Sequence, residues 1–112
     1  MSIASTIAIS GMSAAALRLR VSADNVANAY SDSYEPLRVD QVAKADGSTA
    51  AFVSAVKPNV VFATRDGMVA RPNVDLATEI FQQFLARYTF AANAQVVRTD
   101  ARMTATLLDT LA

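Results

Sequence analysis

The 112-residue chain contains no cysteine, no histidine and no tryptophan. Without cysteine it has no disulfide framework and no thiolate chemistry, and without histidine it lacks the commonest general base and the usual zinc ligand. No glycine-rich phosphate loop and no calcium-loop spacing occurs either. The sequence therefore predicts no catalytic site, no cofactor, no metal site and no small-molecule substrate, and we do not expect an enzyme.

Charged side chains are scarce too, at 18% of the residues, and the 10 basic and 10 acidic ones cancel. A neutral chain lacks the field that attracts nucleic acid or an anionic membrane. Residues 1–17 are uncharged, but no basic residue precedes their apolar part and Arg18 follows too early for a membrane span. We expect no nucleic-acid binding, no membrane insertion and no cleaved signal peptide. Because 53% of the residues are hydrophobic, we expect surfaces hidden against other chains.

The N-terminal segment, residues 3–29, has one glycine and no proline, which predicts a helix. Apolar residues follow it in two stripes with the spacing of a coiled coil. The first stripe is Ile3, Ile7, Ala14, Leu17 and Val21, and the second is Met12, Ala16, Leu19, Ala23, Val26 and Tyr30. Two interpretations stay open: a helix with neighbours on two sides, or one amphipathic helix packed in its own domain.

Residues 31–71 differ in composition and hold two of the three prolines and two of the three glycines. Residues 37–43 alternate apolar and polar, which predicts a half-buried strand. The turn signal Asp46-Gly47 follows, then one or two further strands broken at Pro58-Asn59, and a second turn signal at Asp66-Gly67. The segment reads as a small antiparallel hairpin or meander that needs the helices for support.

The C-terminal segment, residues 74–111, has no glycine or proline and predicts a second, longer helix. Pro72 stands just outside, either Asn73 or Asp75 can cap the first turn, and Asp75 and Glu79 place negative charge at the positive end of the helix dipole. At ~1.5 Å per residue the helix reaches roughly 50 Å, so we expect an elongated molecule. Its apolar stripe contains Ile80, Phe84, Tyr88 and Ala91, widened by Phe81, Leu85 and Ala92 and followed by Val97, Ala101, Thr104, Leu108 and Leu111.

Four aromatic residues gather on this second helix: Phe81, Phe84, Tyr88 and Phe90. We expect them first of all to form a core stripe, as apolar residues at helical spacing usually do. The alternative is a surface that faces another subunit. Phe90 lies off the main stripe and is the better candidate for that surface.

Two apolar-striped helices at the ends of a chain, with strands between them, fold back most simply as an antiparallel pair. The predicted class is mainly α with a small β insert (α+β). We expect residues 1–30 and 72–112 to form one discontinuous helical coiled-coil domain, and residues 31–71 to form the insert.

Both ends of the chain resemble flagellar axial proteins. "SGMSAAALRLRVSADNVANA" resembles their N-terminal motif, and the run from "DGMVARPNVD" to "TATLLDTL" is similar to the C-terminal motif of the flagellar basal-body rod proteins, closest to those of the proximal rod. The motifs stand in the family's order, one at each end. The chain departs from the family at residues 30–34, where Thr-Pro-Gly-Tyr is usual, and at Asp24, where Asn is usual.

The resemblance implies a structural subunit of the rod, which crosses the periplasm and transmits torque. Its terminal helices would pair around a central channel and assemble helically with copies of itself and other rod subunits, after export by the flagellar type III apparatus. The alternative is a small adaptor or chaperone-like module that binds a partner helix in a secretion or flagellar system. The interface residues we expect are Ile7, Leu17, Val21, Val26, Phe84, Leu85, Tyr88, Phe90, Val97 and Leu108.

Overall fold

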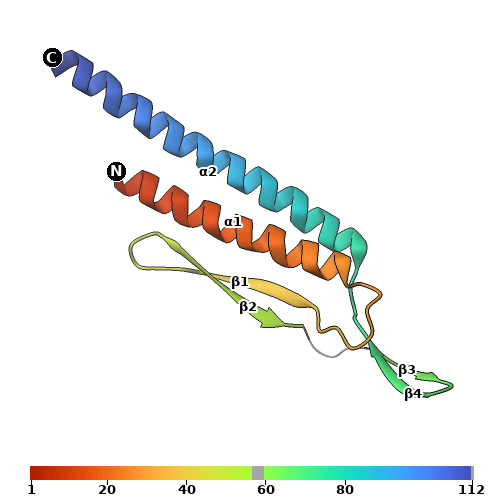
Figure 1. The fold of residues 1–112 in the computed structure, drawn as a ribbon. Helices are drawn as coiled ribbons and strands as arrows, with labels where there is room; N and C mark the ends of the chain where they lie inside the picture. The colour runs from red at the N-terminus through yellow and green to blue at the C-terminus, as the bar shows by residue number, and fades with distance from the viewer. Residues whose placement is uncertain (57–59, 112) are drawn as a thin grey trace.

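The computed structural model of the protein describes residues 1–56 and 60–111. Figure 1 shows two long antiparallel helices with two β-hairpins between them in the sequence. The predicted α+β class and the pairing of the terminal helices are confirmed. The elements are α1 (Ile3–Ala27), β1 (Leu37–Ala43), β2 (Thr49–Ala55), β3 (Val60–Thr64), β4 (Gly67–Arg71) and α2 (Leu76–Leu111).

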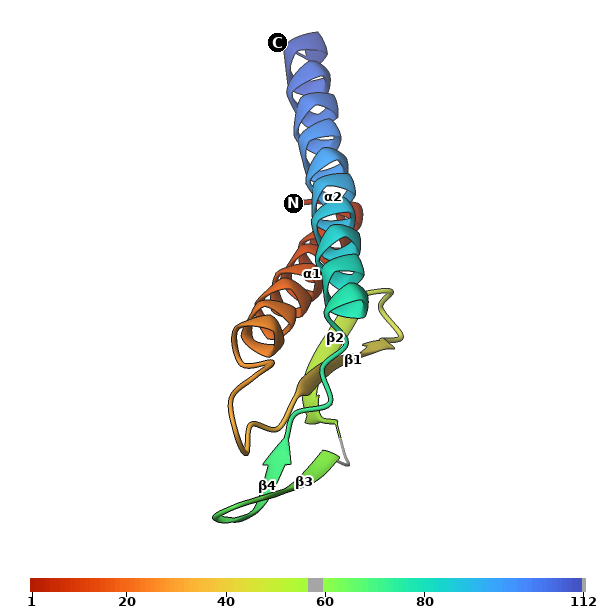
Figure 2. The same ribbon diagram turned by 90° about the vertical axis from the view of Figure 1, so that its right-hand side faces the viewer.

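The molecule is elongated, with extents of 77 × 25 × 15 Å, as the length of the second helix predicts. The turned view in Figure 2 shows that α2 runs on past the N-terminus of α1, while β3 and β4 project from the opposite end. Both helices begin and end within two residues of the predicted ranges. Ser2 caps α1, because its hydroxyl oxygen accepts a hydrogen bond from the Ser5 amide at 3.2 Å.

The β insert consists of two separate antiparallel hairpins, β1–β2 and β3–β4, and not of one meander. Both Asp-Gly turn signals are confirmed, and Gly47 and Gly67 take positive φ angles that favour glycine. The predicted break at Pro58-Asn59 lies outside the described residues. Hairpin β1–β2 packs on α1, where the Thr49 amide donates to the Ser10 hydroxyl at 3.0 Å. Hairpin β3–β4 projects away from the helices (Figures 1 and 2).

Helix α1 therefore lies between α2 and hairpin β1–β2. This arrangement decides between the two interpretations of its double stripe: α1 has neighbours on two sides, and both belong to its own chain. Nearly all of its buried residues are small or polar. They are Ser5, Ala8, Ala14, Ala15, Val21, Ser22 and Asn25.

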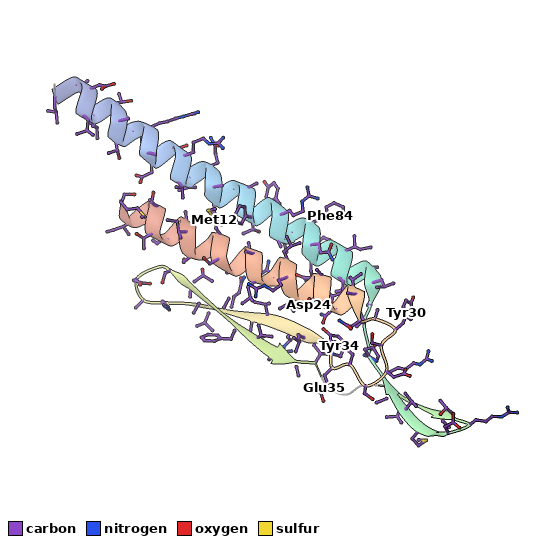
Figure 3. The ribbon with its side chains drawn as sticks, viewed as in Figure 1. Met12, Asp24, Tyr30, Tyr34, Glu35 and Phe84 are labelled. Atoms are coloured by element: carbon purple, nitrogen blue, oxygen red, sulfur yellow. The ribbon has the colours of Figure 1, made fainter. Side chains whose placement is uncertain are left out.

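The predicted aromatic core stripe of α2 is wrong for the single chain. Its side chains are largely exposed, and we call this surface the aromatic face: Ile80 (51%), Phe81 (63%), Phe84 (65%), Leu85 (39%) and Tyr88 (76%). Figure 3 shows Phe84 on the side of α2 that points away from α1. The side that α1 covers contains Ala86, which is 1% exposed. Small residues let two helices approach closely, so they occupy the contact and the large residues remain outside.

Candidate assembly interface

The contact between α1 and α2 has the seven-residue spacing of a coiled coil, but its side chains are small or polar. On α2 the repeat is Glu79, Ala86, Asn93 and Asp100, and on α1 it is Ala8, Ala15 and Ser22. Contacts at its two ends fix the antiparallel register. The Ser22 hydroxyl donates to the Glu79 carbonyl oxygen at 2.9 Å, and the Ser5 hydroxyl donates to Asp100 Oδ2 at 2.5 Å. We call this contact the small-residue seam.

Gly11 lies directly against Asn93 of α2 in the middle of the seam. A Cβ atom added at Gly11 would lie 2.8 Å from Asn93 Nδ2, closer than real Cβ atoms come to other atoms. Asn93 is held in place because its amide donates to the Thr89 carbonyl oxygen at 2.9 Å. A glycine in the middle of α1 costs helix stability, and here it makes room for a polar side chain of the other helix.

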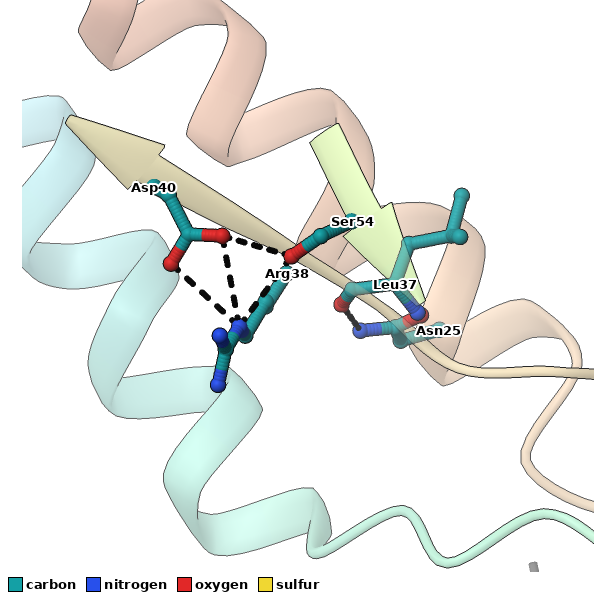
Figure 4. Close-up of polar contacts among 5 residues, drawn as sticks. All are labelled: Asn25, Leu37, Arg38, Asp40 and Ser54. Carbon is teal, nitrogen blue, oxygen red and sulfur yellow. Dashed lines mark hydrogen bonds and ion pairs between the residues drawn. The ribbon is translucent and has the colours of Figure 1, made fainter. Parts of the chain in front are cut away.

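Asn25 is the centre of a buried polar junction between α1, β1 and α2. It is 1% exposed, and both its amide hydrogens and its oxygen are satisfied. Nδ2 donates to the Leu37 carbonyl oxygen at 2.6 Å, drawn in Figure 4, and to Glu79 Oε1 at 2.8 Å. Oδ1 accepts from the Leu37 amide at 2.9 Å and from the Tyr34 hydroxyl at 3.0 Å. One side chain thus positions the start of β1 against the first turn of α2.

The same junction affects the ionisation of Tyr34. Burial, followed by the nearby carboxylates of Asp24 and Glu79, raises the pKa of the Tyr34 phenol. Each of these effects disfavours the charged phenolate. Tyr34 therefore stays neutral and remains a hydrogen-bond donor to Asn25.

Asp75, and not Asn73, caps the first turn of α2. Its Oδ1 accepts from the Ala77 amide at 3.0 Å, and its Oδ2 accepts from the Thr78 hydroxyl at 2.8 Å. The Thr78 hydrogen bond, with those of the backbone amides, lowers the pKa of the Asp75 carboxyl. Glu79 is in the first turn as predicted, and its carboxylate also accepts from Asn25.

At the other end of the seam, Asp100 is held by the first turn of α1. Hydrogen bonds from the Ser5 hydroxyl, and then from Ser2, lower the pKa of the Asp100 carboxyl. On the hairpin, Arg38 Nε lies 3.3 Å from Asp40 Oδ1, and the Ser54 hydroxyl donates to Asp40 Oδ2 at 2.6 Å (Figure 4). This cluster is exposed, so we assign it little stabilising energy.

The predicted interface residues do not form one surface. Val21 is buried inside the single chain, and Ile7 points its Cδ1 atom toward Gly47 of the β1–β2 turn. Leu17, Val26 and Val97 are half-buried. Phe84, Leu85 and Tyr88 lie on the aromatic face, while Leu108 is 64% exposed near the far end of α2.

Phe90 is less exposed than Phe84 and Tyr88, at 41%. It lines a groove of about 380 Å³ along the two helices with Leu19, Arg87, Ala91 and other residues. From the sequence, Phe90 is the favoured subunit-facing side chain because it lies off the main stripe. By exposure, Phe84 and Tyr88 are the better candidates.

Sequence reasoning missed Asn25, Ser5 and Asp100 as residues that hold the helices together. A signal was present, because Glu79, Ala86, Asn93 and Asp100 recur every seven residues. Within the described part of the chain, no group of three or more potential acidic metal ligands comes together. None of the described helices has an apolar stretch of the length needed to cross a bilayer.

Comparison with known proteins gives the context for this architecture. The chain is 30% identical to the flagellar basal-body rod protein FlgC of Agrobacterium fabrum strain C58, over 132 aligned positions that cover 99% of this chain and 95% of the relative. The chain belongs to the flagellar basal-body rod protein family. This match agrees with the resemblance found at both termini and extends it to almost the full length. No protein-family profile matches the chain.

The relative's name and the length of the alignment add two facts to the family membership. The relative carries the name of a rod protein and not of an enzyme, in line with a site built from helix contacts. In addition, 132 aligned positions exceed the 112 residues of this chain. The relative therefore has residues without a counterpart in this chain.

Proposed function

We propose that the protein is a structural subunit of the flagellar basal-body rod, which assembles helically through its terminal helices around the export channel and transmits torque. One observation carries the proposal: the large apolar side chains of α2 face outward. Phe84 is 65% exposed and Tyr88 is 76% exposed, while the interior contact uses small residues. A helix with its bulky apolar face uncovered needs other chains to bury that face.

The proposal includes the location and the partners of the protein. The subunit resides in the periplasmic rod, contacts copies of itself and other rod subunits, and reaches the rod through the flagellar type III export apparatus. Family membership supports this assignment. The elongated helix pair supports it too, because long antiparallel helices transmit force along their axes without flexible joints.

Isolated hook–basal bodies test the proposal directly. An epitope-tagged chain is expected to copurify with them, and deletion of its gene is expected to abolish swimming. The adaptor alternative predicts a different result, with the chain in the soluble fraction bound to a partner and absent from the purified basal body. That result would overturn the assignment as a rod subunit.

A further inference from the structure

The last turns of α2 run on beyond the N-terminus of α1 (Figure 1), and among the described residues only Met103 still borders α1, across a hollow that Ala4 also lines. The seam ends at Asp100, which pairs with Ser5, and all residues from 101 to 111 are exposed. Figures 1 and 2 show this part of α2 running on past the N-terminus. We call residues 101–111 the C-terminal overhang. Its apolar residues are Met103 (56% exposed), Leu107 (64%), Leu108 (64%) and Leu111 (85%).

The overhang repeats the apolar pattern of the aromatic face at the other end of the same helix. Met103, Leu107 and Leu111 are four residues apart, as are Ile80, Phe84 and Tyr88, and Leu108 follows Leu107 as Leu85 follows Phe84. Neither stripe contains a charged residue. Two uncharged stripes of equal spacing and length suit each other as helix-packing surfaces.

We propose that the C-terminal overhang of one copy docks in parallel on the aromatic face of a second copy. This inference rests on the proposed assembly role and specifies the contact between copies. In the parallel register Leu107 lies opposite Phe84, and Leu111 lies opposite Tyr88. Farther along α2, Arg87, Phe90 and Ala91 line the groove between the two helices.

The positions of the two surfaces around α2 decide between an open and a closed assembly. From Phe84 to Leu107 the chain advances 23 residues, which at about 3.6 residues per turn places the two stripes roughly 140° apart around the helix axis. A closed antiparallel dimer needs both stripes on one side of α2. With the stripes on different sides, each copy gives its overhang to one neighbour and receives that of another, which makes a heterologous, open-ended contact.

The size of the contact determines how strongly two copies hold each other. A strip of about three helical turns buries less than the roughly 1,200 Å² of a stable pair. A single docking event is therefore weak, and it becomes stable only when each copy makes two such contacts and other subunit contacts are added. The surface thus favours polymers over isolated dimers.

Because the chain has no cysteine, disulfide cross-linking of single-cysteine variants tests the register. Mixtures of full-length Phe84→Cys with Leu107→Cys, and of Tyr88→Cys with Leu111→Cys, are expected to give about tenfold more covalent dimer under mild oxidation than control mixtures, since docking raises the effective thiol concentration. The matched control is Phe84→Cys with Thr106→Cys, because Thr106 is exposed on another side of the overhang. Circular dichroism checks that every variant is folded.

Other products would overturn the proposal. Dominant cross-linking of Tyr88→Cys to Met103→Cys would show an antiparallel contact, and dimers of a single variant with itself would show an isologous one. No excess over the control, or cross-linking of Phe84→Cys only to a different polypeptide in isolated basal bodies, would exclude a second copy as occupant. If the chain is in basal bodies but no dimer forms, the docking alone fails. If dimers form but the chain is absent from basal bodies, the proposed function alone fails.

Discussion

The Asn25 amide donates a hydrogen bond to Glu79 Oε1 at 2.8 Å and thereby joins the end of α1 to the beginning of α2. Between these residues the chain passes through both hairpins. The contact therefore closes the loop that carries the whole β insert. Because Asn25 also holds Leu37 through both backbone groups, the start of β1 and the start of α2 are positioned by one side chain.

Asn25→Ala is expected to destabilise the chain by about 3 kcal/mol, because it removes the four hydrogen bonds that this buried side chain makes with Leu37, Tyr34 and Glu79. Urea unfolding followed by circular dichroism measures the change. Asn28→Ala is the matched control: Asn28 hydrogen-bonds locally at the end of α1, so its replacement is expected to cost less than about 1 kcal/mol. Equal costs for the two variants would contradict the buried-junction role.

Gly11→Val is expected to destabilise the helix pair by about 1–3 kcal/mol, since the added atoms collide with Asn93 in the middle of the seam. A second substitution, Asn93→Ala, removes the colliding group. The double variant is therefore expected to be more stable than the sum of the single effects by about 1 kcal/mol or more. Chemical denaturation of the four proteins gives this coupling, and strict additivity would argue against the contact.

The sequence predicts most of the secondary structure, but it does not predict which side of α2 packs against α1. The helix ranges follow from long runs without proline and with at most one glycine, and both hairpin turns follow from Asp-Gly. Apolar periodicity, however, indicates only that a face is covered and not by which chain. The stripe through Phe84 is stronger than the one through Ala86, so ordinary reasoning places Phe84 inside. Close packing of Ala86 against α1 reverses that choice.

The residue that caps α2 is a second feature that the sequence alone does not decide. Asn73 and Asp75 have equal capping ability in sequence, and the structure selects Asp75 through its hydrogen bonds to Ala77 and Thr78. Asp75→Ala is expected to cost about 1 kcal/mol of stability, while Asn73→Ala is expected to be close to neutral. Thermal unfolding of both variants checks this. A larger loss of stability in Asn73→Ala than in Asp75→Ala would show that Asn73 is the capping residue.

The hydrogen bond between Ser5 and Asp100 makes the far end of the seam sensitive to acid. The folded-state pKa of Asp100 lies below its unfolded value, so its contribution to stability is complete above the unfolded pKa and is lost as the pH falls through the folded pKa. With an ordinary Asp value of about 4, the loss occurs below roughly pH 4. Ser5→Ala is expected to raise the pKa of Asp100.

Carboxyl chemical shifts recorded during an NMR pH titration measure the effect of Ser5→Ala. Asp75 is the internal control, because its pKa is lowered by Thr78 at the other end of α2 and is expected to stay unchanged. An unchanged Asp100 midpoint in Ser5→Ala would show that this hydroxyl does not hold the carboxylate. A shift of both residues would indicate that the variant changes the whole fold.

Helix α2 is packed against α1 over only part of its length, and amide exchange rates are expected to show this difference. In dilute protein the overhang is the end of a helix with little packing to support it, and such helix ends fray, so residues 103–111 are expected to exchange fast. Residues 14–25 of α1, packed on both sides, are expected to exchange slowly. At concentrations where the chain assembles, docking is expected to slow the amide exchange of the overhang. In Leu107→Asp this exchange is expected to stay fast, because a carboxylate disfavours burial against Phe84. Thr106→Asp is the matched control for Leu107→Asp. In dilute protein, amide exchange in the overhang as slow as in residues 14–25 would show that the segment is stable without a neighbour.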